Sequence, residues 1–321
     1  MRQLLLPTVA AAALVLAGCA ATPAAEEDDG RLSVVASTDV YGSIAEAVGG
    51  DLIDVTSIIS GAAQDPHSYE ASAQDRLALS GADLVIENGG GYDPFIDQLL
   101  EADGGDVPVL TAIEFSHALH DETHEEHEEH AEEEAHDEEG HEGHDHIEGF
   151  NEHVWYDLHT IAHLAEDIAH ELGELDAANA ETYTANAEDF AAELETLEER
   201  ETELSAAWEG SGVAVTEPVP LYLLEASGFV NLTPDAFTEA IEEGSDVPPT
   251  ALQETLAVLE GGQVVLLAYN EQTASAETER VREAAEAAGV TVLDFTETLP
   301  DGEDYLSWMS ANLDRLEAAL A

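Results

Sequence analysis

The sequence has very little positive charge for its length. Its 321 residues include 7 Lys and Arg against 72 Asp and Glu, which gives a formal net charge of −65, and all seven basic residues are arginines. A chain this acidic lacks the basic face that nucleic-acid binding requires, so we expect no nucleic-acid partner. The acidity attracts cations, but charge alone does not establish a metal site.

Only one cysteine is present, Cys19. A single thiol excludes an intrachain disulfide, a Cys-rich zinc cluster and an iron–sulfur site. It follows an apolar run over residues 4–16 that is too short to span a bilayer, and Leu16-Ala17-Gly18-Cys19 resembles a bacterial lipobox. We therefore predict a signal peptide over 1–18, a lipid on Cys19 and an acidic tether over 19–30. An ordinary signal peptide with a chance cysteine is the alternative.

Long hydrophobic runs are also lacking. No stretch after the signal reaches the roughly 18 apolar residues that a membrane-spanning helix needs. We expect the mature chain to be a soluble, monomeric body outside the cytoplasmic membrane, anchored to that membrane by lipidated Cys19.

Strand and helix patterns alternate in both halves of the chain. Short β-branched runs predict strands at 32–37, 55–60, 83–87, 107–110, 213–216, 264–269 and 290–296. Helical patterns lie between them, and the last covers 305–320. This alternation favours mostly parallel sheets flanked by helices. We therefore predict an α/β fold with two lobes, 31–175 and 209–321.

A long helical pattern separates the two predicted lobes. Apolar residues from Tyr183 to Trp208 recur at three- and four-residue steps, and neither Pro nor Gly interrupts 177–208. About 30 residues at ~1.5 Å each span roughly 45 Å, more than the width of a small domain. We interpret 176–208 as a rigid interlobe helix. A helix packed within one domain is the alternative.

Residues 117–146 interrupt the pattern because they are almost entirely His, Asp, Glu and Gly. Such a composition cannot bury a core, so we predict disorder. The histidines of this segment are candidates for weak, auxiliary zinc sites, and a solvated spacer is the alternative reading. They are His117, His120, His124, His127, His130, His136, His141, His144 and His146.

Four polar residues follow predicted strands or the point where order resumes. In α/β sheets, ligands bind beyond the carboxyl ends of the strands. We predict that one site between the lobes collects two imidazoles and two carboxylates, a donor set that suits Zn²⁺ or Mn²⁺. The predicted ligands are His67, His153, Glu217 and Glu297.

Other polar residues receive simpler interpretations. The histidines His159, His163 and His170 fall on a predicted helix, and we interpret them as surface or packing residues. Asn270 and Gln272 end a predicted strand and are candidates for hydrogen bonding behind the metal ligands.

Two motifs carry a resemblance to a known family. Asp65-Pro66-His67-x-Tyr69-Glu70 and Asn151-x-His153-x-Trp155 flank the His-rich segment. This arrangement resembles the zinc/manganese solute-binding lipoproteins of ABC importers, the cluster A-I metal-binding proteins. The resemblance covers essentially all of the mature chain. It implies two lobes joined by a long helix, no enzymatic activity, and one transported metal held between the lobes for delivery to a membrane permease.

Two positions differ from the zinc-binding branch of that family. The third ligand there is usually His, whereas Glu217 looks like the manganese branch. The fourth is usually Asp, whereas Glu297 stands here, with Asp294 as the alternative. Imidazoles favour Zn²⁺ and added carboxylates favour Mn²⁺, so the choice of metal stays open, and a manganese-specific receptor is the alternative.

Two other classes of function are alternatives. A metal-dependent hydrolase is disfavoured because the chain has neither a His-Glu-x-x-His pair nor a Gly-x-Ser-x-Gly elbow. Four protein ligands also leave no open coordination position, which catalytic zinc requires. A surface adhesin is the other alternative, but no motif specifies a macromolecular partner.

Overall fold

The computed structural model describes residues 30–61, 64–103, 107–119, 147 and 149–320. Residues 31–321 form one compact unit. The predicted signal peptide, the predicted lipidation site Cys19 and the eight histidines from His120 to His146 lie outside the described residues. Among the helices that are described, none is long and apolar enough to cross a membrane.

The first sheet has four parallel strands in the order β2-β1-β3-β4. Their side chains alternate between two apolar cores because successive residues of a strand face opposite sides. Leu84 and Ile86 enter one core, and Val85 enters the other. The strands are β1 (Leu32–Thr38), β2 (Ile53–Ile59), β3 (Leu84–Glu87) and β4 (Val109–Thr111).

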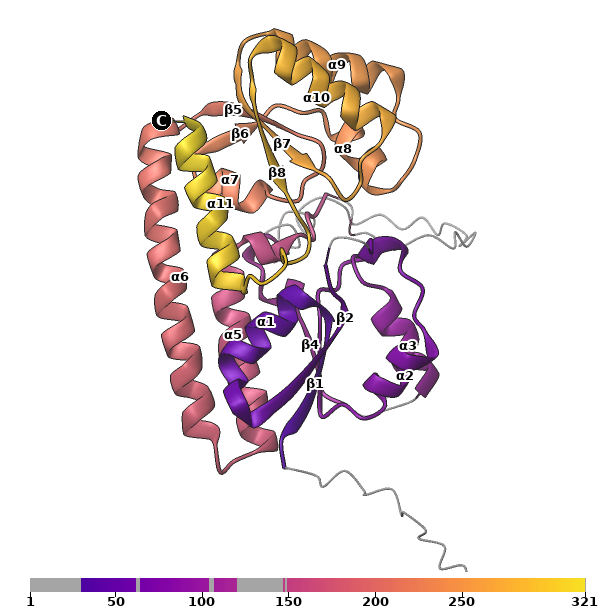
Figure 1. The fold of residues 1–321 in the computed structure, drawn as a ribbon, viewed down its shortest axis with the longest axis vertical. Helices are drawn as coiled ribbons and strands as arrows, with labels where there is room; N and C mark the ends of the chain where they lie inside the picture. The colour runs from indigo at the N-terminus through magenta and orange to yellow at the C-terminus, as the bar shows by residue number, and fades with distance from the viewer. Residues whose placement is uncertain (1–29, 62–63, 104–106, 120–146, 148, 321) are drawn as a thin grey trace, which may run out of the picture. The chain divides into compact units, whose positions relative to one another are not determined.

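Helices cover both faces of this sheet (Figure 1). One face packs against α1 (Asp39–Gly49) and α5 (Leu158–Leu175), and the other against α2 (Ala73–Leu79) and α3 (Phe95–Asp103). A sheet buried on both sides explains why its strands read as nearly continuous apolar runs.

The second sheet repeats the strand order of the first, as β6-β5-β7-β8 with every pair parallel. Its strands are β5 (Ser211–Val215), β6 (Phe229–Asn231), β7 (Val264–Asn270) and β8 (Thr291–Phe295). Its helices are α7 (Leu221–Ala226), α8 (Asp235–Glu242), α9 (Pro249–Glu260), α10 (Ala276–Ala288) and α11 (Tyr305–Leu320). The sequence patterns missed β6 and α8, since three and eight residues are too few to establish a period.

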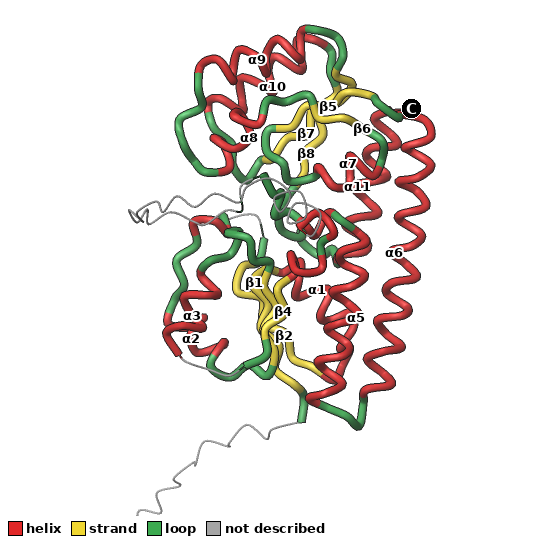
Figure 2. The backbone as a smooth tube through the Cα atoms, turned by 180° about the vertical axis from the view of Figure 1, so that it is seen from behind, coloured by secondary structure: helices red, strands yellow, loops and turns green. Residues whose placement is uncertain are grey.

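Helix α6 (Ala180–Trp208) runs beside α5 and α11 (Figures 1 and 2). Its buried residues, among them Tyr183, Phe190 and Leu194, join a core that includes strands of both sheets. Arg200 adds ion pairs from α6 to Asp314 and Glu317 of α11. The predicted fold class, two parallel α/β sheets with one long helix, is confirmed.

Candidate metal centre

The strand order places the candidate site at a defined point of each sheet. In the first sheet, the chain passes from β1 to β2 on one side and from β3 to β4 on the other, so the strand order reverses between β1 and β3. In the second sheet, it reverses in the same way between β5 and β7. Ligand sites form at the carboxyl ends of such strand pairs. In the second sheet, Glu217 follows β5 and Asn270 ends β7, and the Asn270 amide donates hydrogen bonds to Glu217 and, at 2.7 Å, to Glu297.

His67 is held by a short 3₁₀ turn, Pro66–Ser68, that follows β2. The Asp65 carboxylate caps this turn by accepting the His67 backbone N–H at 3.0 Å, and Pro66 supplies a preset φ at its first position. The His67 ring is buried and meets Tyr92 edge to face, with 4.9 Å between ring centroids. The turn therefore fixes the backbone of His67, and Tyr92 packs against its ring.

His153 precedes a second 3₁₀ turn, Val154–Tyr156. The Asn151 side-chain oxygen accepts the His153 backbone N–H at 3.1 Å and lies 2.8 Å from its Nδ1. The Asn151 amide nitrogen donates to the Pro218 carbonyl at 3.1 Å, which fixes the orientation of the amide group. Because the oxygen facing Nδ1 can only accept, Nδ1 carries the proton, and this is the tautomer that binds a metal through Nε2.

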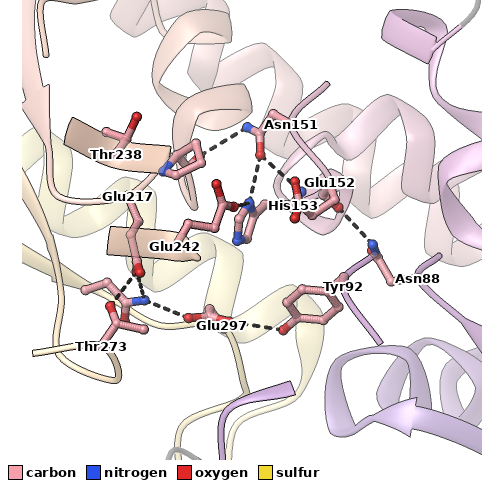
Figure 3. Close-up of polar contacts among 12 residues, drawn as sticks. Asn88, Tyr92, Asn151, Glu152, His153, Glu217, Thr238, Glu242, Thr273 and Glu297 are labelled. Atoms are coloured by element: carbon pink, nitrogen blue, oxygen red, sulfur yellow. Dashed lines mark hydrogen bonds and ion pairs between the residues drawn. The ribbon is translucent and has the colours of Figure 1, made fainter. Parts of the chain in front are cut away.

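The second lobe supplies the carboxylates (Figure 3). Thr273 donates to Glu217 at 2.6 Å, and Tyr92 from the first lobe donates to Glu297 at 3.4 Å. The Gln272 side chain accepts the Glu297 backbone N–H at 2.6 Å. Asn270 and Gln272 therefore do support the candidate ligands, as the sequence predicted.

The structure brings three of the four predicted ligands together directly. Nitrogen or oxygen atoms of His67, His153 and Glu297 all lie within 4.8 Å of one another. Glu217 is outside that group of three, but it shares the Asn270 amide with Glu297. A cavity of about 470 Å³, bordered by His67 from the first lobe and residues 240–247 from the second, adjoins the cluster. We call the four predicted ligands, His67, His153, Glu217 and Glu297, the interlobe cluster.

Asp294, the alternative fourth ligand, belongs to β8 and faces a different group. Its carboxylate lies 3.5 Å from Nη1 of Arg282, and its backbone carbonyl accepts from Arg315 at 2.6 Å. The geometry therefore favours Glu297 over Asp294.

Two acidic residues near the cluster were missed by sequence reasoning. Ligand atoms of His67, Glu152 and Glu242 also lie within 4.8 Å of one another, and Glu242 Oε1 is 3.7 Å from His153 Nδ1. Glu152 lies inside the Asn151-x-His153 motif, which offered a signal. Glu242 lies at the end of the unpredicted helix α8, so no sequence signal distinguished it from the other acidic residues.

Burial raises the pKa of the carboxyl groups at this site. The pKa of Glu217 rises to about 7 and that of Glu297 to about 8, and for Glu297 the nearby Glu217 adds to the effect of burial. The pKa of Glu242 rises to about 10, for burial and then for repulsion from Glu152. These groups resist carrying negative charge together, and a divalent cation between them removes that penalty.

His117 is the one residue of the predicted auxiliary set that the structure describes. Its ring contacts His159 of α5, at 3.0 Å between the two Nε2 atoms. His117 is grouped with His159 and His163, and not with the ligands of the interlobe cluster.

Comparison with known proteins identifies the family. Residues 34–319 match the family model described as ZnuA, zinc-uptake complex component A, periplasmic. The chain belongs to this family. The match covers both sheets, α6 and all four predicted ligands of the interlobe cluster.

Two relatives of this ZnuA family member are named for different metals, manganese and iron. The manganese-binding lipoprotein MntA of Halalkalibacterium halodurans is 29% identical over 220 residues, covering 68% of this chain and 65% of that protein. An iron ABC transporter substrate-binding lipoprotein, MtsA of Streptococcus pyogenes, is 25% identical and covers 96% of this chain and 94% of that protein.

Solved structures share the fold of this ZnuA family member. The periplasmic zinc-binding protein TroA of Treponema pallidum aligns with a TM-score of 0.70 at 18% identity, over 91% of this chain and 100% of that one. The Mn²⁺ complex of FpvC from Pseudomonas aeruginosa aligns with a TM-score of 0.65 at 23% identity, over 90% and 98%.

Proposed function

We propose that this chain captures Zn²⁺ or Mn²⁺ between its lobes and delivers the ion to the permease of an ABC importer. As a member of the ZnuA family, it is a metal-binding solute receptor. The proposed ligands are His67, His153, Glu217 and Glu297. The observation that carries the proposal is the convergence of His67, His153 and Glu297, which are far apart in sequence, within 4.8 Å.

The donor set fits a transported ion rather than a catalytic one. Neutral imidazole and carboxylate are ligands that zinc and manganese accept. With four protein ligands no position remains for a reactive water, so capture and release need no covalent chemistry. We therefore propose a receptor without enzymatic activity, which binds its metal as cargo.

The donor set of the interlobe cluster suits more than one cation. At a two-imidazole, two-carboxylate site Zn²⁺ binds more tightly than Mn²⁺ by the general affinity order, so availability selects the ion. Glu152 and Glu242 place further carboxylates beside His67. These oxygen donors favour the harder Mn²⁺ more than an all-imidazole site does.

The proposed location follows from the N-terminal sequence. Leu16-Ala17-Gly18-Cys19 has the form of a lipobox, and the relatives MntA and MtsA are named lipoproteins. We propose that lipid on Cys19 anchors a monomeric receptor at the outer side of the cytoplasmic membrane. Mass spectrometry of the protein from bacterial membranes tests this by the mass of its N-terminal peptide.

Metal titration of the full mature chain tests the interlobe ligands. We expect one tight Mn²⁺ site by calorimetry, lost in His67→Ala and in Glu297→Gln. Glu303→Gln is the matched control, because Glu303 is an exposed residue in the turn that precedes α11, and its tight site should be retained. Unchanged tight binding in both ligand variants, with unchanged circular dichroism, would contradict the assignment.

A transport measurement tests delivery. Bacteria whose single copy of the receptor carries Glu297→Gln should take up ⁵⁴Mn²⁺ and ⁶⁵Zn²⁺ more slowly than bacteria carrying Glu303→Gln. Equal uptake of both ions at equal protein levels would argue against the receptor role of this site.

A further inference from the structure

Three histidines meet on the surface of the first lobe, in a cluster separate from the interlobe one. The Nε2 atom of His159 lies 3.0 Å from Nε2 of His117 and 3.3 Å from Nε2 of His163. Ligand atoms of all three lie within 4.8 Å of one another. His117 and His159 are exposed and His163 is half-buried. We call this group the α5 trio.

The fold holds these rings together from two segments. His159 and His163 are four residues apart on α5, so they lie on one face, a turn apart. The 3₁₀ turn Ala112–Phe115 packs on α5, and the half-buried Ala118 and Leu119 rest on the apolar core. These contacts anchor the chain on both sides of His117.

The rings of His117 and His163 both approach His159 through their Nε2 atoms. The His117 and His159 rings stack with 21° between their planes and 5.0 Å between centroids, and the His163 ring stands edge-on to His159 at 4.7 Å. Nε2 of His159 is the shared neighbour of the other two Nε2 atoms.

Hydrogen bonds between the rings cannot satisfy all three Nε2 atoms. A ring nitrogen either donates one proton or accepts through one lone pair, so Nε2 of His159 can satisfy one histidine neighbour but not both. A cation bound by three lone pairs satisfies all three nitrogens at once. Tetrahedral zinc with Zn–N bonds of about 2.0–2.1 Å places its nitrogens about 3.3–3.4 Å apart, which matches the 3.3 Å pair and lies near the 3.0 Å pair.

An acidic neighbour supports one of the rings from behind. Nδ1 of His163 lies 3.6 Å from Oε2 of Glu166 on the next turn of α5. A carboxylate near Nδ1 favours the tautomer with Nδ1 protonated and Nε2 free, an arrangement typical of metal-bound histidine.

From this geometry we propose a second metal site, in which His117, His159 and His163 bind a borderline divalent cation of the Zn²⁺ type through Nε2. With no carboxylate among its ligands, the trio prefers Zn²⁺ over Mn²⁺. Because the site is exposed, water completes the coordination. The site stands on contacts of its own and does not depend on the ligands proposed for the interlobe cluster.

Zinc counting on the full mature chain tests the proposal. The double variant His159→Asn/His163→Asn should bind one Zn²⁺ per chain fewer than the wild type in equilibrium dialysis. The control is Asp189→Asn, an exposed residue of α6 that belongs to none of the metal-binding groups among the described residues, and it should bind as many Zn²⁺ as the wild type. All other histidines are identical among these proteins, so the His-rich segment contributes equally.

Two further measurements keep the outcome decisive. The tight Mn²⁺ site of the double variant should be unchanged, which separates the trio from the interlobe cluster and shows that the fold is intact. Crystals grown with Zn²⁺ should give an anomalous peak about 2.1 Å from all three Nε2 atoms. An equal zinc count in the double variant, or zinc-loaded crystals without that peak, overturns the proposal.

Discussion

The two histidine-containing clusters differ in burial, in donor type and in support. The interlobe cluster is buried, mixes imidazole with carboxylate, and is held by amide and hydroxyl groups such as Asn270 and Thr273. The α5 trio is mostly exposed, contains only imidazole, and has the carboxylate of Glu166 beside its His163 ring. Burial with fixed support favours tight retention, whereas exposure favours rapid exchange. We therefore expect histidine to serve different purposes in these two surroundings.

The largest expected difference between the clusters is in their response to pH. Folded Glu217 and Glu297 hold protons up to about pH 7 and 8, while the unfolded chain releases them near pH 4.3. The folded metal-free protein therefore binds more protons in this window, and its stability falls as pH rises from about 5 to 8, by an order of a few kcal/mol. Thermal unfolding of metal-free protein at several pH values measures this slope.

A bound cation should reverse that trend at the interlobe cluster. Because metal displaces the protons, the rise in unfolding temperature on adding Mn²⁺ should be larger at pH 8 than at pH 5.5. Glu297→Gln should make the metal-free slope smaller, and Glu303→Gln should keep it unchanged. Identical slopes in the two variants would show that the interlobe carboxyl groups do not control the pH response.

The next largest effect is expected from the amide that joins the two carboxylates. Asn270→Ala removes the shared donor to Glu217 and Glu297 and should weaken Mn²⁺ binding by about 10–100-fold, as loss of a group supporting metal ligands typically does. Calorimetry measures the change. Gln263→Ala is the control, because Gln263 is an exposed amide at the other end of β7. Equal affinities in the two variants would contradict a supporting role for Asn270.

A smaller effect is expected from one hydrogen bond between the lobes. The Tyr222 hydroxyl donates to the Asn151 carbonyl at 2.7 Å. Tyr222→Phe removes a bond worth about 1 kcal/mol, so Mn²⁺ affinity should fall by about 5-fold. Tyr183→Phe is the control, since its hydroxyl bonds to Asp176 at 3.3 Å, away from the interlobe cluster. A larger loss in the control than in Tyr222→Phe would refute this reasoning.

The smallest effect is expected at the α5 trio. Glu166→Gln removes the charge that faces Nδ1 of His163. Exposed ion pairs contribute about 0.2–1 kcal/mol, so zinc affinity of the trio should fall by no more than about 5-fold. Chelator competition measures it, with Glu174→Gln as the control on the same helix. Mn²⁺ binding between the lobes should not change in either variant.

The strand pattern led to three of the four candidate ligands of the interlobe cluster, because those three residues follow strands. The runs that end before His67, Glu217 and Glu297 are apolar and β-branched, and parallel strands bring their carboxyl ends to one edge. His153 was found through its motif.

The α5 trio could not be predicted from local sequence patterns. His159 and His163 were interpreted as surface residues, and helical spacing places them on one face. Their partner His117 is 42 residues away from His159, in a segment assigned to disorder by composition. That pairing depends on how the turn at 112–115 packs against α5, which no local pattern encodes. Glu242 was missed for the same reason, since packing of α8 brings it near His153.

The rigidity of helix α6 bears on how the bound metal ion is released. A hinge needs a few residues that absorb large φ and ψ changes, and the 29 residues of α6 include neither Gly nor Pro. The C-terminal helix α11 is a second connection between the lobes. The Tyr305 backbone N–H donates a hydrogen bond to the Ser43 hydroxyl, and the Tyr305 hydroxyl donates one to the Trp155 carbonyl, both in the first lobe. Wide opening of the cleft between the lobes is therefore disfavoured in the isolated receptor. We expect the metal ion to dissociate slowly until docking to the permease changes the conformation of the loops that hold the ion.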